Sequence, residues 1–144
     1  MRTWTATTTA AAGPEAVLDV LTDPEAAAHW APLPFDVDEL KGRRLGRGSR
    51  ARVSGKLAGR RVGFDIHVHE ADDSGLRLSA DGPVGLDVDY ALAPTDGGSE
   101  VRASVSVRPG RGLGARLLAE AMGALLTAGA LQTTVTRVAR AATL

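Results

Sequence analysis

The feature that most constrains this chain is a succession of short alternating runs followed by one long apolar segment. Residues 60–70, 84–93 and 100–108 each place apolar side chains at every second position. Strict alternation indicates a strand with one covered face and one wet face. Turn sequences at 72–75 and 95–98 separate the runs. The pattern therefore predicts an antiparallel meander.

The whole chain follows one order of elements. A Thr-rich strand at the N-terminus precedes two short helices, the first opened by Pro14 and the second ending near residue 30. Residues 113–140 then predict one unbroken helix of roughly 42 Å. We expect a single α+β domain over residues 1–144, in which a curved seven-stranded antiparallel sheet grips that helix. The predicted strands are 2–11, 35–41, 49–57, 60–70, 75–81, 84–93 and 100–108.

The long helix has one stripe in which large side chains alternate with small ones. Aromatic residues make up only 3% of the chain, so few side chains are able to fill a large space. Two outcomes follow: the helix approaches the sheet closely, or a ligand cavity remains, and the scarcity of aromatics favours the cavity. The stripe consists of Leu117, Ala121, Leu125, Ala128, Gln132, Val135 and Ala139.

Composition excludes several classes of protein. Lys and Arg total 17 and Asp and Glu total 17, so the chain lacks the basic excess of a nucleic-acid binder. The absence of cysteine excludes a disulfide scaffold and a thiolate metal site. No signal-like apolar stretch begins the sequence, and residues 122–131 are too few to span a bilayer. We expect a cytoplasmic protein, and the sequence gives no oligomeric state.

The order of elements, together with four local sequences, resembles the SRPBCC or START-like superfamily with its helix-grip fold. The local sequences are AGPEAV at 12–17, LTDPE at 21–25, HWAP at 29–32 and FDIHVHE at 64–70. That superfamily includes polyketide cyclases and lipid-transfer proteins. The resemblance implies a cavity for an apolar small molecule between the sheet and the C-terminal helix. It does not imply one activity, because binders, carriers and enzymes share the fold.

The candidate ligand-binding residues are the apolar ones of the covered face and two polar ones among them. Tyr90 and Gln132 each bring a group that needs a hydrogen-bond partner, which a ligand or the protein itself would supply. The resemblance puts Trp30 at the cavity entrance, while an ordinary core tryptophan is the alternative. The full set is Trp30, Phe35, Phe64, Leu86, Val88, Tyr90, Leu118, Ala121, Leu125 and Gln132.

Two residues are candidates for proton transfer. His29 adjoins Trp30, and an imidazole there would serve as acid or base near neutral pH. A solvated histidine at a helix end is the alternative. Tyr90 would supply a proton from the covered face, or would be a core tyrosine.

Other patterns have more ordinary explanations. His67 and His69 with Asp65 resemble a metal-binding spacing, but the alternation puts them on the wet face, so we predict no metal and no cofactor. Residues 110–114 contain three glycines before a helix, which predicts a flexible turn rather than an anion site. An arginine-rich region would dock an acidic carrier protein or form a solvated mixed face. Its members are Arg44, Arg47, Arg50, Arg52, Arg60 and Arg61, and the face of Arg52 is left open.

The sequence thus favours a protein that binds a lipid- or polyketide-like apolar molecule, because no acid–base pair is evident on the covered face. An enzyme of the polyketide cyclase/dehydratase type is the alternative. A protein-interaction module with a collapsed interior is the third class. The sequence leaves open whether the protein is an enzyme.

Overall fold

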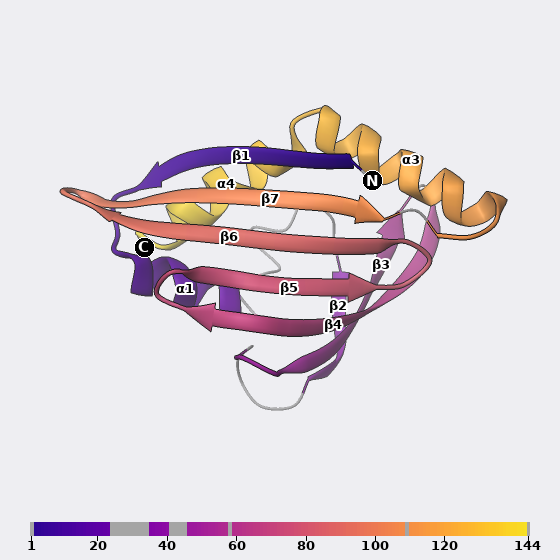
Figure 1. Ribbon diagram of the computed structural model, residues 1–144, viewed down its shortest axis with the longest axis horizontal. Helices are drawn as coiled ribbons and strands as arrows, with labels where there is room; N and C mark the ends of the chain where they lie inside the picture. Colours follow the sequence, from indigo (N-terminus) through magenta and orange to yellow (C-terminus); the bar gives the residue numbers. More distant parts are fainter. Residues whose placement is uncertain (1, 24–34, 41–45, 58, 109, 144) are drawn as a thin grey trace.

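The fold is one seven-stranded antiparallel sheet with helices against one face (Figure 1). The structure is a computed structural model that describes residues 2–23, 35–40, 46–57, 59–108 and 110–143, with the backbone alone for residues 35–40 and 57. The strand order β1-β7-β6-β5-β4-β3-β2 confirms the predicted sheet. The strands are β1 Arg2–Ala10, β2 Phe35–Leu40, β3 Arg50–Leu57, β4 Arg60–Asp72, β5 Gly75–Asp81, β6 Gly85–Thr95 and β7 Gly98–Arg108.

Helix α1, Pro14–Thr22, follows β1 as predicted. Pro14 stands in the first turn, where its missing N–H costs nothing. Near the other end, Thr22 Oγ1 donates a hydrogen bond to the carbonyl of Leu18 at 2.8 Å. The second short helix, predicted to end near residue 30, lies outside the described residues.

The C-terminal segment is two helices, so the prediction of one unbroken helix over 113–140 is wrong. Helix α3 spans Leu113–Thr127 and α4 spans Ala130–Ala141, and their axes differ by 59°. Gly129 separates them with φ of 100°, a left-handed conformation that ends a helix at little cost only for glycine. No single helix among the described residues is long and apolar enough to cross a membrane.

The break also changes which helix residues face the sheet. On α3 the buried side chain is Leu118, whereas Leu117, which the predicted stripe contained, is 57% exposed. On α4 the buried positions include Leu131, Val135 and Val138. Because the two helix axes differ by 59°, a single helical wheel cannot show which residues of both helices face the sheet. The predicted stripe is therefore correct only in part on both helices. On α3, Ala121 and Leu125 pack beside the smaller buried cluster whereas Leu117 is exposed, and on α4 Val135 and Ala139 are buried whereas Gln132 is exposed.

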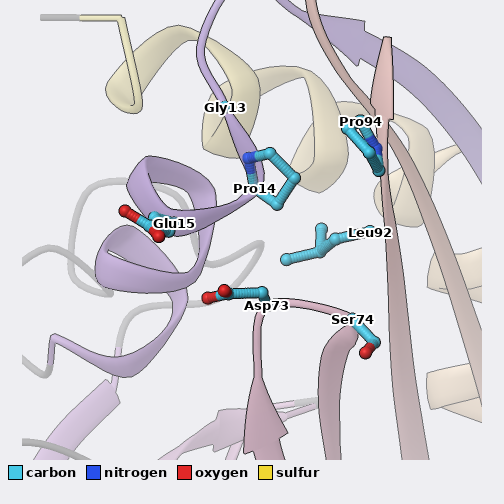
Figure 2. A pocket seen from close by; sticks show the side chains of 7 residues that line it. All are labelled: Gly13, Pro14, Glu15, Asp73, Ser74, Leu92 and Pro94. Atoms are coloured by element: carbon cyan, nitrogen blue, oxygen red, sulfur yellow. The ribbon is translucent and has the colours of Figure 1, made fainter.

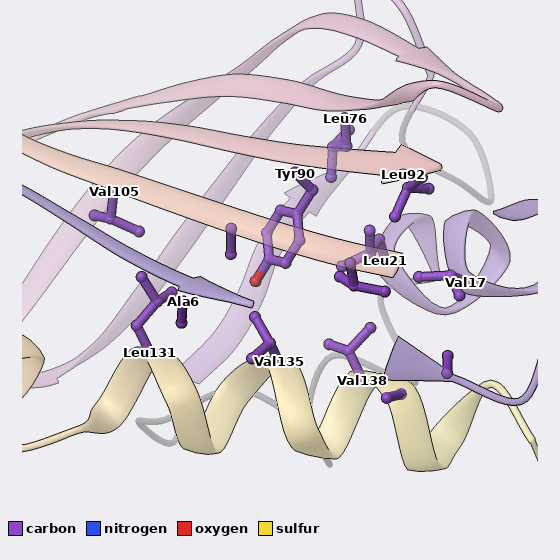
Figure 3. Close-up of a cluster of buried hydrophobic side chains, with 14 of the residues drawn as sticks. Ala6, Val17, Leu21, Leu76, Tyr90, Leu92, Val105, Leu131, Val135 and Val138 are labelled. Carbon is purple, nitrogen blue, oxygen red and sulfur yellow. The ribbon is translucent and has the colours of Figure 1, made fainter. Parts of the chain in front are cut away.

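Cross-strand pairing gives the sheet an apolar inner face, which we define as the face toward α3 and α4. Tyr90 on β6 pairs with Leu76 on β5 and Ala103 on β7, so all three side chains point inward. Figure 3 shows Tyr90 facing Leu131 and Val135 of α4. Burying valine or leucine side chains of this kind stabilises the fold by roughly 1.5–3 kcal/mol each.

The buried interior consists of two clusters at different places under the helices. The larger one joins α1, α4 and the strands β1, β4, β5, β6 and β7, and includes Val17, Tyr90 and Val135. The smaller one lies beneath α3 and consists of Val62, Val84 and Leu118. The helices therefore bury the two ends of the inner face separately.

Candidate functional site

Between the two clusters lies an apolar strip of the inner face that the helices do not fully cover. Cross-strand pairs Val88–Leu78, Leu86–Ala80 and Ile66–Ala80 place these side chains on the inner face. Four of the inner-face side chains in this region are only half-buried, in contrast to Tyr90 and Leu76: Ile66, Leu78, Leu86 and Val88. We define the apolar strip as these four residues.

Helix α3 contributes further half-buried apolar side chains on the inner face of the sheet. Ala121, Met122 and Leu125 pack beside the smaller cluster together with Phe64. Leu118 is buried within that cluster. Of the predicted site residues, Phe64, Ala121 and Leu125 thus border the smaller cluster, which contains Leu118. Leu86 and Val88 border the larger cluster. Apolar surface of this kind, inward-facing yet accessible, is what a small apolar ligand covers.

Tyr90 is the next inner-face residue after Val88 on β6, and its side chain is only 4% exposed. Its hydroxyl forms no hydrogen bond with any residue that the structure describes, and because no fully enclosed polar side-chain atom there lacks a partner, the hydroxyl oxygen keeps some contact with solvent. Burial raises the pKa of the Tyr90 hydroxyl above its ordinary value, because the phenolate form loses its hydration. Tyr90 therefore presents a neutral hydrogen-bond donor at the end of the apolar strip.

Gln132 does not join these residues, and the prediction that it lies in the buried stripe is wrong. Its side chain is exposed on α4, and Nε2 donates a long hydrogen bond of 3.4 Å to the carbonyl of Thr7 on β1. The 59° bend before α4 turns Gln132 outward and leaves Leu131 and Val135 to face the sheet. The Gln132 amide is thus hydrogen-bonded to the edge strand β1.

Three predicted residues have little or no described structure. His29 and Trp30 lie outside the described residues. Phe35 is described by its backbone, which pairs with Gly55 at the start of β2. Their assigned roles stay predictions.

The histidine pair and Arg52 lie on the outer face of the sheet. The rings of His67 and His69 have centroids 4.5 Å apart, and His69 Nε2 and Ser79 Oγ share a hydrogen bond of 2.9 Å. Arg52 Nε donates to Asp65 Oδ1 at 3.0 Å, which resolves its face as outward. Within the described part of the chain, no three His, Asp or Glu side chains are grouped for a metal ion.

A separate pocket opens at the end of the sheet where α1 begins (Figure 2). Its volume is about 470 Å³, and Leu92, Pro14 and Pro94 give it an apolar wall. Glu15 and Asp73 also line it, and Figure 2 shows their carboxylates directed away from Leu92. The sequence alone does not predict this pocket, because Pro14 indicates only the start of a helix and residues 72–75 indicate only a turn. Its lining is Gly13, Pro14, Glu15, Asp73, Ser74, Leu92 and Pro94.

A curved antiparallel sheet with an apolar inner face against C-terminal helices defines the helix-grip, START-like class of protein. Within that class, the sequence profile of the family described as "Polyketide cyclase / dehydrase and lipid transport" matches residues 1–143, and the chain belongs to this family. A search of curated proteins finds no match.

Solved structures confirm the fold. Protein CV1439 from Chromobacterium violaceum is similar with a TM-score of 0.72 and 18% identity, over 97% of this chain and 96% of that one. TTHA0849 from Thermus thermophilus has a TM-score of 0.72 and 16% identity, over 99% and 97%. DynU16, a putative protein in the dynemicin biosynthetic locus, has a TM-score of 0.62 and 21% identity, over 96% of this chain and 46% of that one.

Proposed function

We propose that this protein binds a neutral, apolar small molecule, lipid- or polyketide-like, between the inner face of the sheet and α3. The observation that supports it is the accessible apolar strip, which ends at a Tyr90 hydroxyl without a partner among the described residues. Removing the strip and the apolar part of the ligand from water favours binding by about 25 cal/mol per Å² before entropic costs. The family to which the chain belongs includes lipid transport.

The proposed ligand has one hydrogen-bond acceptor, such as a carbonyl oxygen, near one end. Tyr90 stays protonated and donates, since burial disfavours its phenolate. The side chains of the apolar strip, and the half-buried Met122 and Leu125 of α3, bring no charge to pair with an ionised ligand. A carboxylate would lose its hydration there, and these described side chains offer it no cation in return. This favours ketones, esters and alcohols over free acids.

Native mass spectrometry of the purified protein, followed by organic extraction, tests the proposal. We expect a retained small molecule, and binding of the neutral apolar dye Nile red. Val88→Trp should abolish both, because the indole would occupy the strip. Arg102→Trp, on the exposed outer face of β7, is the matched control and should change neither. A wild-type protein with no retained molecule and no dye binding would overturn the proposal.

A cyclase/dehydratase-type activity is the second candidate, and the neutral Tyr90 hydroxyl favours it. A buried donor stabilises the negative charge that develops on a carbonyl oxygen during enolisation. His29 is the proposed proton acceptor. The test is incubation with a synthetic poly-β-ketone thioester, whose ring closure with loss of water lowers its mass. Equal rates for wild type, Tyr90→Phe and His29→Ala would discard this assignment.

A further inference from the structure

The outward face of α3 is unusually apolar for a helix in water. Leu113 is 75% exposed and Leu117 is 57% exposed. The two leucines are four residues apart and so lie one turn apart on the same face. Ala124 continues this exposed face toward the end of the helix. Helix α3 already buries Leu118 against the sheet, so these leucines belong to a second apolar surface.

Arginines surround this surface. Arg111 and Arg116 are exposed before and within α3. Arg60 of β4 reaches the first turn, where its Nη1 lies 3.8 Å from the position that a Cβ on Gly114 would occupy. Glu120 is the one acidic residue in the α3 sequence. Among these charged side chains on and beside α3, three arginines thus stand against one glutamate.

We propose that the outward face of α3 docks on the surface of an anionic lipid bilayer. Leu113 and Leu117 enter the boundary between headgroups and acyl chains, and Arg60, Arg111 and Arg116 pair with lipid phosphates. Apolar side chains flanked by arginine on an exposed helix are typical of an interfacial helix that lies on a membrane. This inference goes beyond ligand binding and does not depend on it.

A second copy of the chain fits this face less well than a bilayer does. In a two-fold dimer the same patch meets itself, which would bring Arg116 of each copy against the arginines of the other. Stable interfaces also bury about 800 Å² per partner, far more than two leucine side chains provide. An anionic bilayer matches the positive charge and needs only shallow insertion.

Sedimentation of the full chain with lipid vesicles tests the proposal. The vesicles consist of phosphatidylcholine alone or of phosphatidylcholine mixed with phosphatidylglycerol. We expect binding to the anionic vesicles that weakens as salt is added, because salt screens the arginines. The double variant Leu113→Gln/Leu117→Gln should lose about tenfold or more in partitioning.

Arginine substitutions measure the electrostatic contribution to vesicle binding. Arg111→Gln/Arg116→Gln should lose roughly fivefold in partitioning for each arginine. Arg47→Gln/Arg102→Gln removes the same charge from exposed positions away from α3 and should bind as wild type does. The chain lacks cysteine, so Leu117→Cys carries one environment-sensitive label. Its emission should shift to the blue on anionic vesicles, while a label on Arg102→Cys should not change.

The outcomes that overturn the proposal are distinct. The proposal is contradicted if the wild-type protein binds neither type of vesicle, or if it binds neutral vesicles as tightly as anionic ones. Equal binding by wild type and the leucine variant also contradicts it. Light scattering that shows a dimer dissolved by the leucine substitutions would assign the face to a second copy. Because the leucines are outside the inner face, retained Nile red binding by the leucine variant separates this surface from the proposed ligand site and shows that the variant is folded.

Discussion

Trp4 Nε1 donates a hydrogen bond to Thr127 Oγ1 at 3.2 Å, which joins the first strand to the last residue of α3. The guanidinium of Arg2 stacks over the Trp4 ring with 4.7 Å to its centroid. Through this contact the β1 edge fixes the end of α3 just before the chain bends. Trp4 therefore adds a polar contact to the apolar packing of Leu118 that holds α3 against the sheet.

Thr127→Val tests this contact, because it removes the hydroxyl and keeps the shape. We expect a loss of about 0.5–1 kcal/mol in the free energy of unfolding, the usual net worth of one hydrogen bond. Urea unfolding followed by Trp fluorescence measures it. Thr133→Val, at an exposed position of α4, is the control. Equal losses in the two variants would show that the Trp4 bond contributes nothing beyond helix propensity.

Gly123→Ala should stabilise the protein. Gly123 is inside α3, and an added Cβ would lie 3.5 Å from Trp4 Cη2, an ordinary contact distance. Alanine restricts the unfolded chain more than glycine does and favours the helix by about 0.5–1 kcal/mol. Thermal unfolding should show a higher midpoint. A lower midpoint would mean that the Trp4 ring cannot accept the extra methyl group.

Gly129→Ala should have the opposite effect. Gly129 has φ of 100°, where a Cβ meets its own backbone, so we expect a loss of about 1–2 kcal/mol. Gly97→Ala is a matched control, since its Cβ would have open space around it and it has no positive φ. Unfolding free energies compare the two. A Gly129→Ala protein as stable as wild type would show that the bend between α3 and α4 straightens without cost.

The strands followed from the sequence, whereas the helix break did not. Alternation along β6 placed Leu86, Val88 and Tyr90 on one face correctly, because the side-chain period of a strand is two residues and turns mark its ends. Gly129 gave no comparable signal. An isolated glycine costs a helix only about 1 kcal/mol, so it does not by itself predict an end.

Some residues of the candidate site could be predicted from the sequence, but the complete set could not. Cross-strand register places Ile66 beside Ala80 and Leu78 beside Val88, and register depends on pairings between residues far apart in sequence. The sequence therefore identified Leu86 and Val88 but missed Ile66 and Leu78. A single helical wheel over residues 113–140 puts Gln132 inward, and the 59° bend turns it outward.

Tyr90→Phe should separate stability from binding. The hydroxyl has no hydrogen bond to lose among the described residues, so we expect the unfolding free energy to stay within about 0.5 kcal/mol of wild type or to rise. The affinity for a ketone-bearing ligand should fall by roughly tenfold, the worth of one buried hydrogen bond. Isothermal calorimetry with a long-chain ketone and with the matching alkane measures this. Equal losses for ketone and alkane would contradict a donor role.

Alkaline stability should depend on Tyr90. Its pKa is raised in the folded protein above the ordinary value of 10.0, so above pH 10 the unfolded chain loses a proton that the folded chain keeps. The Tyr90 contribution is therefore unchanged below pH 10, and stability falls by about 1.4 kcal/mol per pH unit above it. Urea unfolding across this range should show a steeper decline in wild type than in Tyr90→Phe, which lacks the group. Tyr90 is the one tyrosine of the chain, so phenolate absorbance reports it directly. Ionisation of the folded protein at the ordinary pKa would mean that water reaches the hydroxyl freely.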